Sequence, residues 1–298
     1  MKPTFIGLGG QKCASTWIHS VLKDHPHAYV STPKEIDFFS SFYENGFQWY
    51  ERSFASAQHQ RAIGEISPSY LPDSNAPARA HEYNPRFRII VSLRDPVERA
   101  YSNHLHEVRL GHYADEDLSF EAGLANNPMY LEQSRYAKHL GCWLRHFPRD
   151  QLLVILQEEI SADPAQQAQR LYQFLGLDSR RVPAGAAGRV NDSYLPKSRL
   201  REQLFRAAGD ATRALGLSRF VEFLRGAGVI GALHRGNRLN IREVVPPMRD
   251  ATRDELYRLF GTECIELARM IGRESLPWKT WELAAGGPAL QALCSPRT

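Results

Sequence analysis

The N-terminal segment places a pair of glycines directly between an apolar run and an amphipathic pattern. Residues 4–8 form a short apolar run that stops at Gly9 and Gly10, and apolar residues then recur at helical spacing over residues 17–22. Pro26 ends the second pattern, because proline does not continue a helix. The segment therefore predicts a strand, a glycine turn and a helix in direct succession.

A second segment repeats this order further along the chain. Residues 87–93 have the apolar character of a buried strand, and a helical pattern follows from Val97 to about Arg109. Asp95 suits the N-cap of that helix, and Pro96 suits its first position.

Similar patterns predict the other elements of an α/β core. We expect strands at residues 28–31, 63–67 and 152–156, and helices at residues 134–147 and 164–175. Because strands alternate with helices, we predict a mainly parallel sheet that is flanked by helices in three layers.

The pattern changes after this core. Only helices are predicted there, at about residues 200–224 and 249–271, and no internal repeat is present. We therefore expect a single domain over residues 1–298, with an α/β core at 1–188 and a mostly helical C-terminal part at 189–298.

The charge balance and the hydropathy limit the class of protein. Lysine and arginine number 37 against 33 aspartate and glutamate, so the net charge is only +4. This small excess favours local binding of small anions over binding of nucleic acid along a basic face. The apolar run at residues 5–8 is too short and too rich in glycine for a signal peptide or a membrane span. We therefore expect a soluble, cytoplasmic protein that binds no nucleic acid.

The cysteines do not form a metal-binding pattern. They lie far apart, without a CxxC pair or a histidine spacing typical of zinc sites. Their positions are Cys13, Cys142, Cys264 and Cys294. No metal-binding carboxylate follows a strand either, so we expect no metal.

The first glycine turn has the composition of an anion site. A turn between a strand and a helix directs backbone N–H groups and the positive end of the helix dipole at one point. Lys12 adds a full charge, and the hydroxyls of Ser15 and Thr16 can donate to oxyanions. Because Lys12 is followed by Cys13 rather than Ser or Thr, the segment is not a Walker A motif. A glycine turn with a solvated lysine is the alternative interpretation.

Two segments carry a resemblance to a known family. Gln11-Lys12-Cys13-Ala14-Ser15-Thr16-Trp17 resembles the 5′-phosphosulfate loop of sulfotransferases that use 3′-phosphoadenosine 5′-phosphosulfate (PAPS). Residues 91–102 resemble the 3′-phosphate motif of the same family, with Arg94 at the strand end and Ser102 on the following helix. Both motifs occur in the family's order, although Arg94 before a capped helix would by itself indicate only an exposed arginine. The resemblance implies a P-loop-like α/β fold that binds PAPS and releases adenosine 3′,5′-bisphosphate (PAP).

The resemblance also implies a set of donor-binding residues, and a later loop adds polar and basic groups that suit the 3′-phosphate or the adenine. That loop could equally be a plain linker. The complete set is Gln11, Lys12, Cys13, Ala14, Ser15, Thr16, Trp17, Arg94, Ser102, Tyr194, Lys197, Ser198 and Arg199.

A third segment indicates the branch of the family. Residues 34–39, Lys-Glu-Ile-Asp-Phe-Phe, are similar to the heparan-sulfate type and its bacterial relatives, in which the glutamate of this segment is the catalytic base. The resemblance thus implies that Glu35 takes a proton from the acceptor, while Lys12 stabilises the departing phosphate. Lys34 is expected to add charge at the sulfuryl oxygens. Without the resemblance, Glu35 would be read as a surface carboxylate beside Lys34.

One position departs from that branch. Ile66 stands where heparan-type relatives commonly have a lysine, and Lys34 is our candidate for its replacement. Cytosolic small-molecule sulfotransferases use a histidine in this strand region, and none occurs between residues 61 and 71. His104 and His106 are weaker candidates to line an acceptor groove.

The sequence therefore predicts an enzyme that moves a sulfuryl group from PAPS to a hydroxyl or amine of an acceptor. The heparan-type resemblance favours a saccharide, and other small-molecule, lipid and peptide acceptors stay open. A P-loop kinase and a nucleotide-binding module without catalysis are the alternatives, and the missing Walker A residues argue against the kinase.

Overall fold

The computed structural model describes residues 1–113, 115–180, 194–196 and 238–286. The helix expected at residues 200–224 lies outside the described residues, as do Lys197, Ser198 and Arg199.

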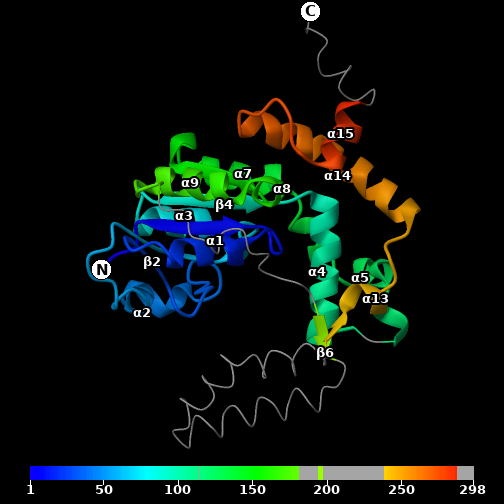
Figure 1. The fold of residues 1–298 in the computed structure, drawn as a ribbon, viewed down its shortest axis with the longest axis horizontal. Coiled ribbons are helices and arrows are strands. Elements are labelled where there is room, and N and C mark those ends of the chain that lie inside the picture. The colour runs from blue at the N-terminus through cyan, green and yellow to red at the C-terminus, as the bar shows by residue number, and fades with distance from the viewer. Residues whose placement is uncertain (114, 181–193, 197–237, 287–298) are drawn as a thin grey trace, which may run out of the picture. The chain divides into compact units, whose positions relative to one another are not determined.

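Five parallel strands form the sheet at the centre of the fold (Figure 1). Their order across the sheet is β2-β3-β1-β4-β5. The strands are β1 (Phe5–Gly9), β2 (Ala28–Val30), β3 (Ala62–Ile66), β4 (Arg88–Leu93) and β5 (Leu152–Leu156). Each lies within one residue of its predicted position, and the predicted parallel sheet is confirmed.

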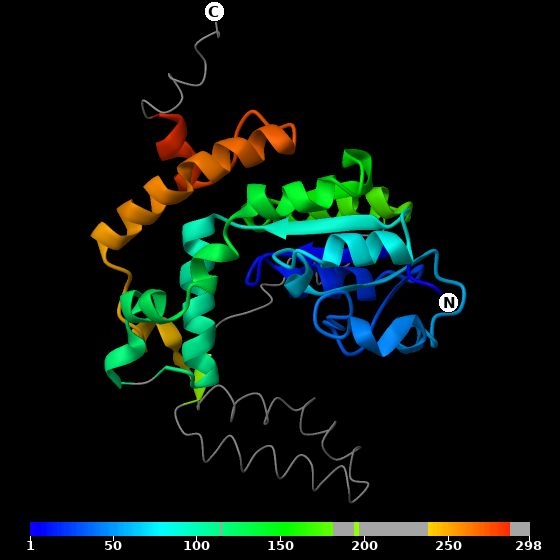
Figure 2. The ribbon, with the colours of Figure 1, turned by 180° about the vertical axis from the view of Figure 1, so that it is seen from behind.

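Side chains alternate between the two faces of the sheet, as the pleat of a strand requires. Ile89 and Val91 of β4 belong to one buried cluster, whereas Ile90 belongs to the other. The first cluster includes side chains of α3 (Ala76–Tyr83), α7 (Tyr136–Leu144) and α14 (Asp250–Met270). The second includes side chains of α1 (Ser15–Lys23) and α9 (Pro164–Leu175). Helices therefore pack on both faces, which makes the three layers seen from opposite sides in Figures 1 and 2.

The central strand β1 needs glycine because its neighbours approach its backbone closely. A Cβ at Gly7 would lie 2.7 Å from Ile66 Cγ1, and a Cβ at Gly9 would lie 2.4 Å from Ser92 Oγ. Strands β3 and β4 pair with β1 on its two sides. Because all strands run in one direction, the loops that follow β1, β3 and β4 meet at the same edge of the sheet, where ligands of parallel α/β folds bind.

The predicted N-terminus of the helix after β4 is confirmed. Helix α4 (Pro96–Leu110) begins at the predicted proline. Asp95 Oδ1 accepts hydrogen bonds from the N–H groups of Val97 at 2.9 Å and Glu98 at 3.3 Å, so it caps the helix.

The described residues form two compact units. The first contains residues 1–103, 124–180 and 248–286, and the second contains residues 104–123, 194–196 and 238–247.

The expectation that only helices follow the core is wrong. Strands β6 (Tyr194–Pro196) and β7 (Arg238–Asn240) form an antiparallel pair in which Leu195 faces Leu239. Each has three residues, and such short pairs leave little apolar periodicity in the sequence. Tyr194, a residue predicted to bind PAPS, is the first residue of β6 and pairs with Asn240.

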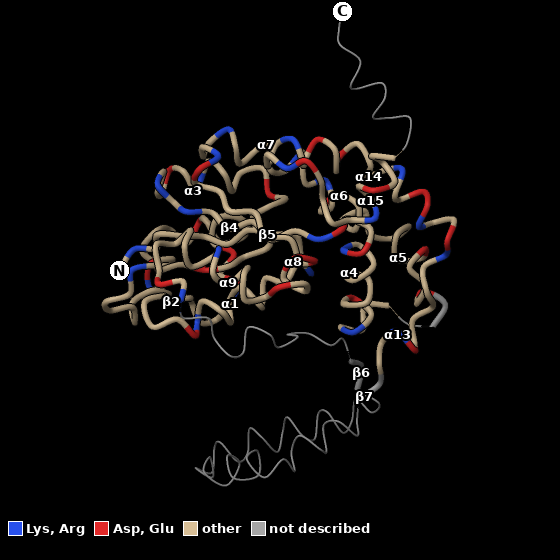
Figure 3. Tube along the Cα trace, turned by 45° about the horizontal axis from the view of Figure 1, so that its top comes forward, with Lys and Arg blue, Asp and Glu red and all other residues tan. Residues whose placement is uncertain are grey.

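Shorter helices complete the described chain. They are η1 (Tyr43–Asn45), α2 (Gly46–Arg52), η2 (Pro68–Tyr70), η3 (Asp115–Leu118), α5 (Phe120–Asn126), α6 (Met129–Glu132), η4 (Arg149–Gln151), α8 (Gln157–Ala162), α13 (Ile241–Val244) and α15 (Lys279–Ala285). Among the described residues, no helix combines the length and the apolar character needed to cross a membrane. Basic and acidic residues are interspersed along the described chain (Figure 3). An anion site must therefore be assembled locally, from side chains of separate segments.

Candidate active site

The loop after β1 has an unusual backbone. Lys12 and Ala14 adopt the left-handed conformation, with φ of 69° and 66°, and α1 begins at Ser15. Successive N–H groups in such turns form a concave surface that binds anions, and the first N–H groups of a helix have no intrahelical partner. The predicted anion loop therefore has a backbone suited to a phosphate.

Two residues of this loop turn their side chains into the protein. Cys13 is fully buried and Trp17 is 4% exposed. Cys13 Sγ lies 3.7 Å from the hydroxyl of Tyr136, and burial raises the pKa of the thiol to about 11. Cys13 is therefore a neutral packing residue, and its backbone is the part that can contact a ligand. Gln11 is exposed, and Lys12 and Thr16 are partly exposed.

The segment after β2 meets this loop. Lys34 Nζ donates a hydrogen bond to Ser15 Oγ at 3.2 Å and forms an ion pair with Glu35. The side chain of Glu35 is 44% exposed, whereas that of Lys34 is 20% exposed. The structure thus brings together three of the predicted site residues, with a cation and an accessible carboxylate at the start of α1.

The backbone around Glu35 is also unusual. Glu35 has φ of 67° and Asp37 has φ of 54°. With Lys12 and Ala14, they are the described non-glycine residues that adopt positive φ. Such conformations cost energy and persist where the surrounding structure holds them, commonly at functional sites.

Residues of the segment after β3 hold this backbone in place. Ser67 Oγ accepts a hydrogen bond from the N–H of Asp37 at 3.0 Å, and the hydroxyl of Tyr70 accepts one from Phe38 at 2.8 Å. Both hydroxyls donate onward to the carboxylate of Glu65. One buried carboxylate is therefore the final acceptor for two hydroxyl groups that fix the loop carrying Glu35.

The environment of Glu65 is almost free of water. Its side chain is fully buried, and burial raises its pKa to about 7, although the hydrogen bonds from Ser67 and Tyr70 oppose this shift. Tyr50 adds a third hydroxyl, 3.4 Å from Oε1. Sequence analysis missed Glu65. An acidic residue inside the apolar run of a strand was the signal that could have found it, because buried acids are rare unless they are hydrogen-bonded.

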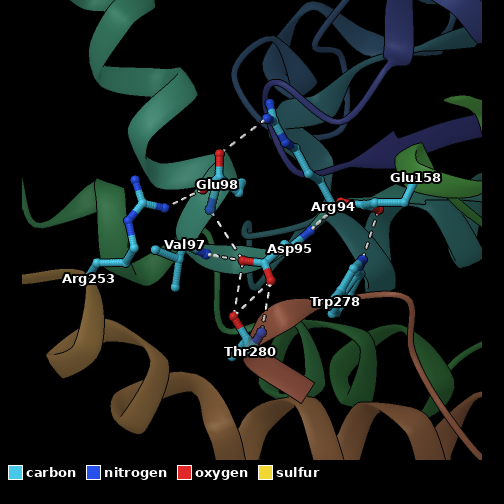
Figure 4. A network of polar contacts seen from close by, with 8 residues as sticks. All are labelled: Arg94, Asp95, Val97, Glu98, Glu158, Arg253, Trp278 and Thr280. Carbon is cyan, nitrogen blue, oxygen red and sulfur yellow. Dashed lines mark hydrogen bonds and ion pairs between the residues drawn. The ribbon is translucent and has the colours of Figure 1, made fainter. Parts of the chain in front are cut away.

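The second predicted phosphate motif lies at the carboxyl end of β4. Arg94 reaches over the first turn of α4, where its Nη2 lies 3.7 Å from Glu98 Oε2 (Figure 4). Glu98 and Ser102 are four residues apart and so lie on one face of the helix. Arg94 and Ser102 therefore flank the same face, as binding of one phosphate by both requires. Arg253 Nη1 also donates to Glu98 at 2.6 Å, so two guanidinium groups share this carboxylate.

Comparison with known proteins shows the family of this chain. A family model described as a sulfotransferase domain matches residues 2–196 of the 298. The chain belongs to the sulfotransferase family.

Curated relatives come from the heparan-type branch. Mouse (Mus musculus) heparan sulfate glucosamine 3-O-sulfotransferase 3A1 is 34% identical over 181 residues, which cover 59% of this chain and 46% of the relative. Mouse bifunctional heparan sulfate N-deacetylase/N-sulfotransferase 4 is 25% identical over 303 residues, which cover 94% of this chain and 31% of the relative. The chain thus spans less than half the length of these relatives.

A solved structure shares the fold. The sulfotransferase from Alicyclobacillus acidocaldarius matches with a TM-score of 0.66 and 22% sequence identity, over 92% of this chain and 97% of that one. The predicted α/β architecture of the family is therefore confirmed.

Ile66, the position at which we expect a departure from the heparan-type pattern, has a clear place in the structure. Ile66 is fully buried in the cluster that contains the apolar face of α1. Its side chain packs against Gly7 and adds no charge to the site. Among the described residues near the phosphate loop, Lys34 is the cation that contacts Ser15.

The two candidate histidines belong to the second unit. His104 is buried, and its Nε2 lies 2.9 Å from the carbonyl oxygen of Leu118. Burial lowers the pKa of His104, which favours the neutral ring. His106 Nδ1 lies 3.0 Å from Arg109. Both have local contacts typical of helix residues.

The aromatic residues that follow Glu35 divide into two groups. Phe38 and Phe39 are fully buried, and Phe38 stacks on Tyr50 with ring centroids 4.5 Å apart. Phe42 and Phe47 are 47% and 37% exposed. The first group stabilises the loop, and the second is available to contact an acceptor.

The residues predicted to bind the two phosphate groups fall into two sets. One set, Lys12, Ser15 and Thr16, belongs to the loop and helix after β1, and another, Arg94 and Ser102, to the turn and helix after β4. Each set combines a cation with hydroxyl donors, as phosphate oxygens require. Among the described residues, no group of three His, Cys, Asp or Glu side chains is arranged to hold a metal ion.

Proposed function

We propose that this chain transfers a sulfuryl group from PAPS to a hydroxyl or amine of a saccharide. The hydrogen bond between Lys34 and Ser15 carries the proposal, because it joins the phosphate loop to the Lys34–Glu35 pair. An acidic group that can take a proton then lies beside cations that can stabilise negative charge. Sulfuryl transfer needs both.

PAPS, the sulfuryl donor, would be held at its two phosphate groups. The loop of Lys12 and the hydroxyls of Ser15 and Thr16 suit the 5′-phosphosulfate, and Arg94 with Ser102 suits the 3′-phosphate. When bound, PAPS supplies the sulfuryl group and leaves as PAP. Lys197, Ser198 and Arg199 stay predictions for the nucleotide, as does the side chain of Tyr194.

The residues of the loop after β2 would act on the acceptor. Glu35 is the proposed general base, because its carboxylate is accessible and its backbone is held by hydrogen bonds. Lys34 donates to Ser15, and this contact with the phosphate loop supports a role for Lys34 in stabilising charge during transfer. Lys12 has the equivalent task at the leaving phosphate, where preorganised positive charge lowers the barrier.

The acceptor class is inferred from the relatives. Their names describe 3-O-sulfation of a glucosamine and N-sulfation, both in heparan sulfate. We propose a glycosaminoglycan-like saccharide, with the choice between oxygen and nitrogen open to experiment. A cytoplasmic location, a single-domain organisation and independence of metal stay predictions.

Two measurements test this function. In a thermal-shift assay, PAP should raise the melting temperature more than ATP with magnesium does. Stabilisation by ATP with magnesium alone would overturn the donor assignment and favour a kinase.

The second measurement is an acceptor screen with PAPS that carries labelled sulfur. Matched heparan-type oligosaccharides with free amino, N-acetyl and N-sulfo groups separate N-sulfation from O-sulfation. Label should enter at least one saccharide. Binding of PAP without transfer to any acceptor class would instead support a nucleotide-binding module.

A further inference from the structure

The turn that carries Arg94 is built around a buried carboxylate, Asp95, and a partly buried one, Glu158. Asp95 is 3% exposed, and its Oδ1 caps α4. Its own N–H donates to Glu158 Oε1 at 3.0 Å. The backbone on the carboxyl side of Arg94 is thus held by Glu158, which follows β5.

Both carboxylates also accept hydrogen bonds from the C-terminal part of the same unit (Figure 4). Thr280 donates to Asp95 through its backbone N–H at 3.1 Å and through its hydroxyl at 2.9 and 3.0 Å. Trp278 Nε1 donates to Glu158 Oε2 at 2.9 Å. Thr280 is fully buried and Trp278 is 1% exposed.

These donors are needed because the carboxylates are shielded from water, Asp95 almost completely and Glu158 in part. Burial raises the pKa of Asp95 and that of Glu158, and the hydrogen bonds from Thr280 and Trp278 oppose the two shifts. A buried acceptor that loses its donor keeps the cost of desolvation, so the surrounding backbone tends to shift. Loss of either donor would therefore loosen the turn rather than remove a single surface contact.

A third carboxylate extends the same network to the guanidinium group. Glu98 accepts from Arg253 on α14 and pairs with Arg94. The backbone next to Arg94 is thus connected to the uncharged residues Trp278 and Thr280. The side chain of Arg94 is connected through Glu98 to Arg253.

We propose that Trp278 and Thr280 are positioning residues that hold Arg94 ready for the 3′-phosphate of PAPS. The proposal rests on the proposed function, in which Arg94 binds that phosphate. Neither residue touches the donor. Each acts through a carboxylate that fixes the turn.

The test compares the affinities for PAP and for adenosine 5′-monophosphate (AMP), which lacks the 3′-phosphate. Isothermal titration gives the ratio of the two dissociation constants, which reports the 3′-phosphate contact by itself. Thr280→Val and Trp278→Phe should each reduce the preference for PAP by about tenfold, as expected for a weakened charged contact, with AMP affinity unchanged. Thr280→Ser keeps the hydroxyl and should keep the preference.

Trp143→Phe is the matched control. Trp143 is also fully buried in the first unit, but its Nε1 has no hydrogen-bond partner in the described structure. The substitution therefore makes the same change of side-chain volume without removing a hydrogen bond, and the preference for PAP should persist. In an Arg94→Ala background, Trp278→Phe should cause no further loss.

The outcomes separate the two proposals. If the wild-type chain does not prefer PAP to AMP, the function proposed for Arg94 fails, and this inference fails with it. If the wild-type chain prefers PAP and both variants keep that preference, the positioning role alone is overturned. Should Trp278→Phe not fold, the comparison of Thr280→Val with Thr280→Ser decides.

Discussion

Lys34 Nζ donates to Ser15 Oγ at 3.2 Å and pairs with Glu35, so a single side chain links the phosphate loop to the proposed base. The two loops come from different strands of the parallel sheet, and their residues are 19 positions apart. Their contact brings the groups proposed for charge stabilisation and for proton removal together at one edge of the sheet.

Glu35→Gln should slow turnover by on the order of 10²–10⁴ while PAP affinity is retained. Glutamine keeps the size of the side chain but cannot take the acceptor's proton. Turnover with labelled PAPS and titration with PAP measure the two quantities. Glu44→Gln, an exposed change in the same region, is the control. Near-normal turnover of Glu35→Gln would remove the base assignment, and His104 and His106 would be the next residues to test.

Lys12→Ala should lower PAP affinity and turnover together. The lost cation would contact the bound phosphate and would also stabilise the charge that grows on it during transfer. The exposed Lys23, at the other end of α1, gives a control with the same change of net charge. An effect of equal size in Lys23→Ala would show that only the overall charge matters.

Arg94→Ala should weaken PAP binding by about 1.5–3 kcal/mol, the usual range for a hydrogen bond to a charged group. Ser102→Ala should weaken it less. Turnover at saturating PAPS should change little in both, because the 3′-phosphate is remote from the sulfur. Arg109→Ala, in the last turn of the same helix, is the control. Unchanged PAP affinity in both Arg94 and Ser102 variants would exclude this motif from the site.

Tyr70→Phe should destabilise the fold and slow turnover. The substitution removes the acceptor of the Phe38 N–H and a donor to Glu65, at a cost of about 1–3 kcal/mol. Tyr172→Phe is a matched control, since it also loses a buried hydrogen bond, to the carbonyl of Val21 in the other cluster. Urea unfolding should show losses in both variants, whereas turnover of the folded protein should fall only in Tyr70→Phe. Equal turnover in Tyr70→Phe and Tyr172→Phe would show that the hydrogen bonds holding the Glu35 loop contribute to stability alone.

Glu65 should make stability depend on pH. Its pKa is raised from 4.5 to about 7 in the folded protein, so the folded state holds the proton more tightly than the unfolded state does. The unfolding free energy of the wild type, relative to Glu65→Gln, should therefore fall as the pH rises from about 4.5 to about 7 and then level off. Urea titrations across this window measure the difference. A difference that rises with pH would show that the hydrogen bonds from Ser67 and Tyr70 outweigh burial.

Local patterns in the sequence were sufficient to predict the parallel core and the capped helix after Asp95. Strand and helix periodicities, caps and glycine turns depend on neighbouring residues, and their signals survive without tertiary information. The same reasoning could not find the β6–β7 pair, whose three-residue strands are too short for a periodic signal.

The sequence by itself supplied the residues of the proposed chemistry, including Lys12, Glu35 and Arg94, because each stands in a contiguous motif that resembles those of sulfotransferases. Only the tertiary structure decided how they are held. Glu65 receives its hydroxyl donors inside a buried strand, and Thr280 meets Asp95 from 185 residues away. Contacts of this kind depend on which segments the packed layers bring together, and they cannot be predicted from the spacing of residues along the chain.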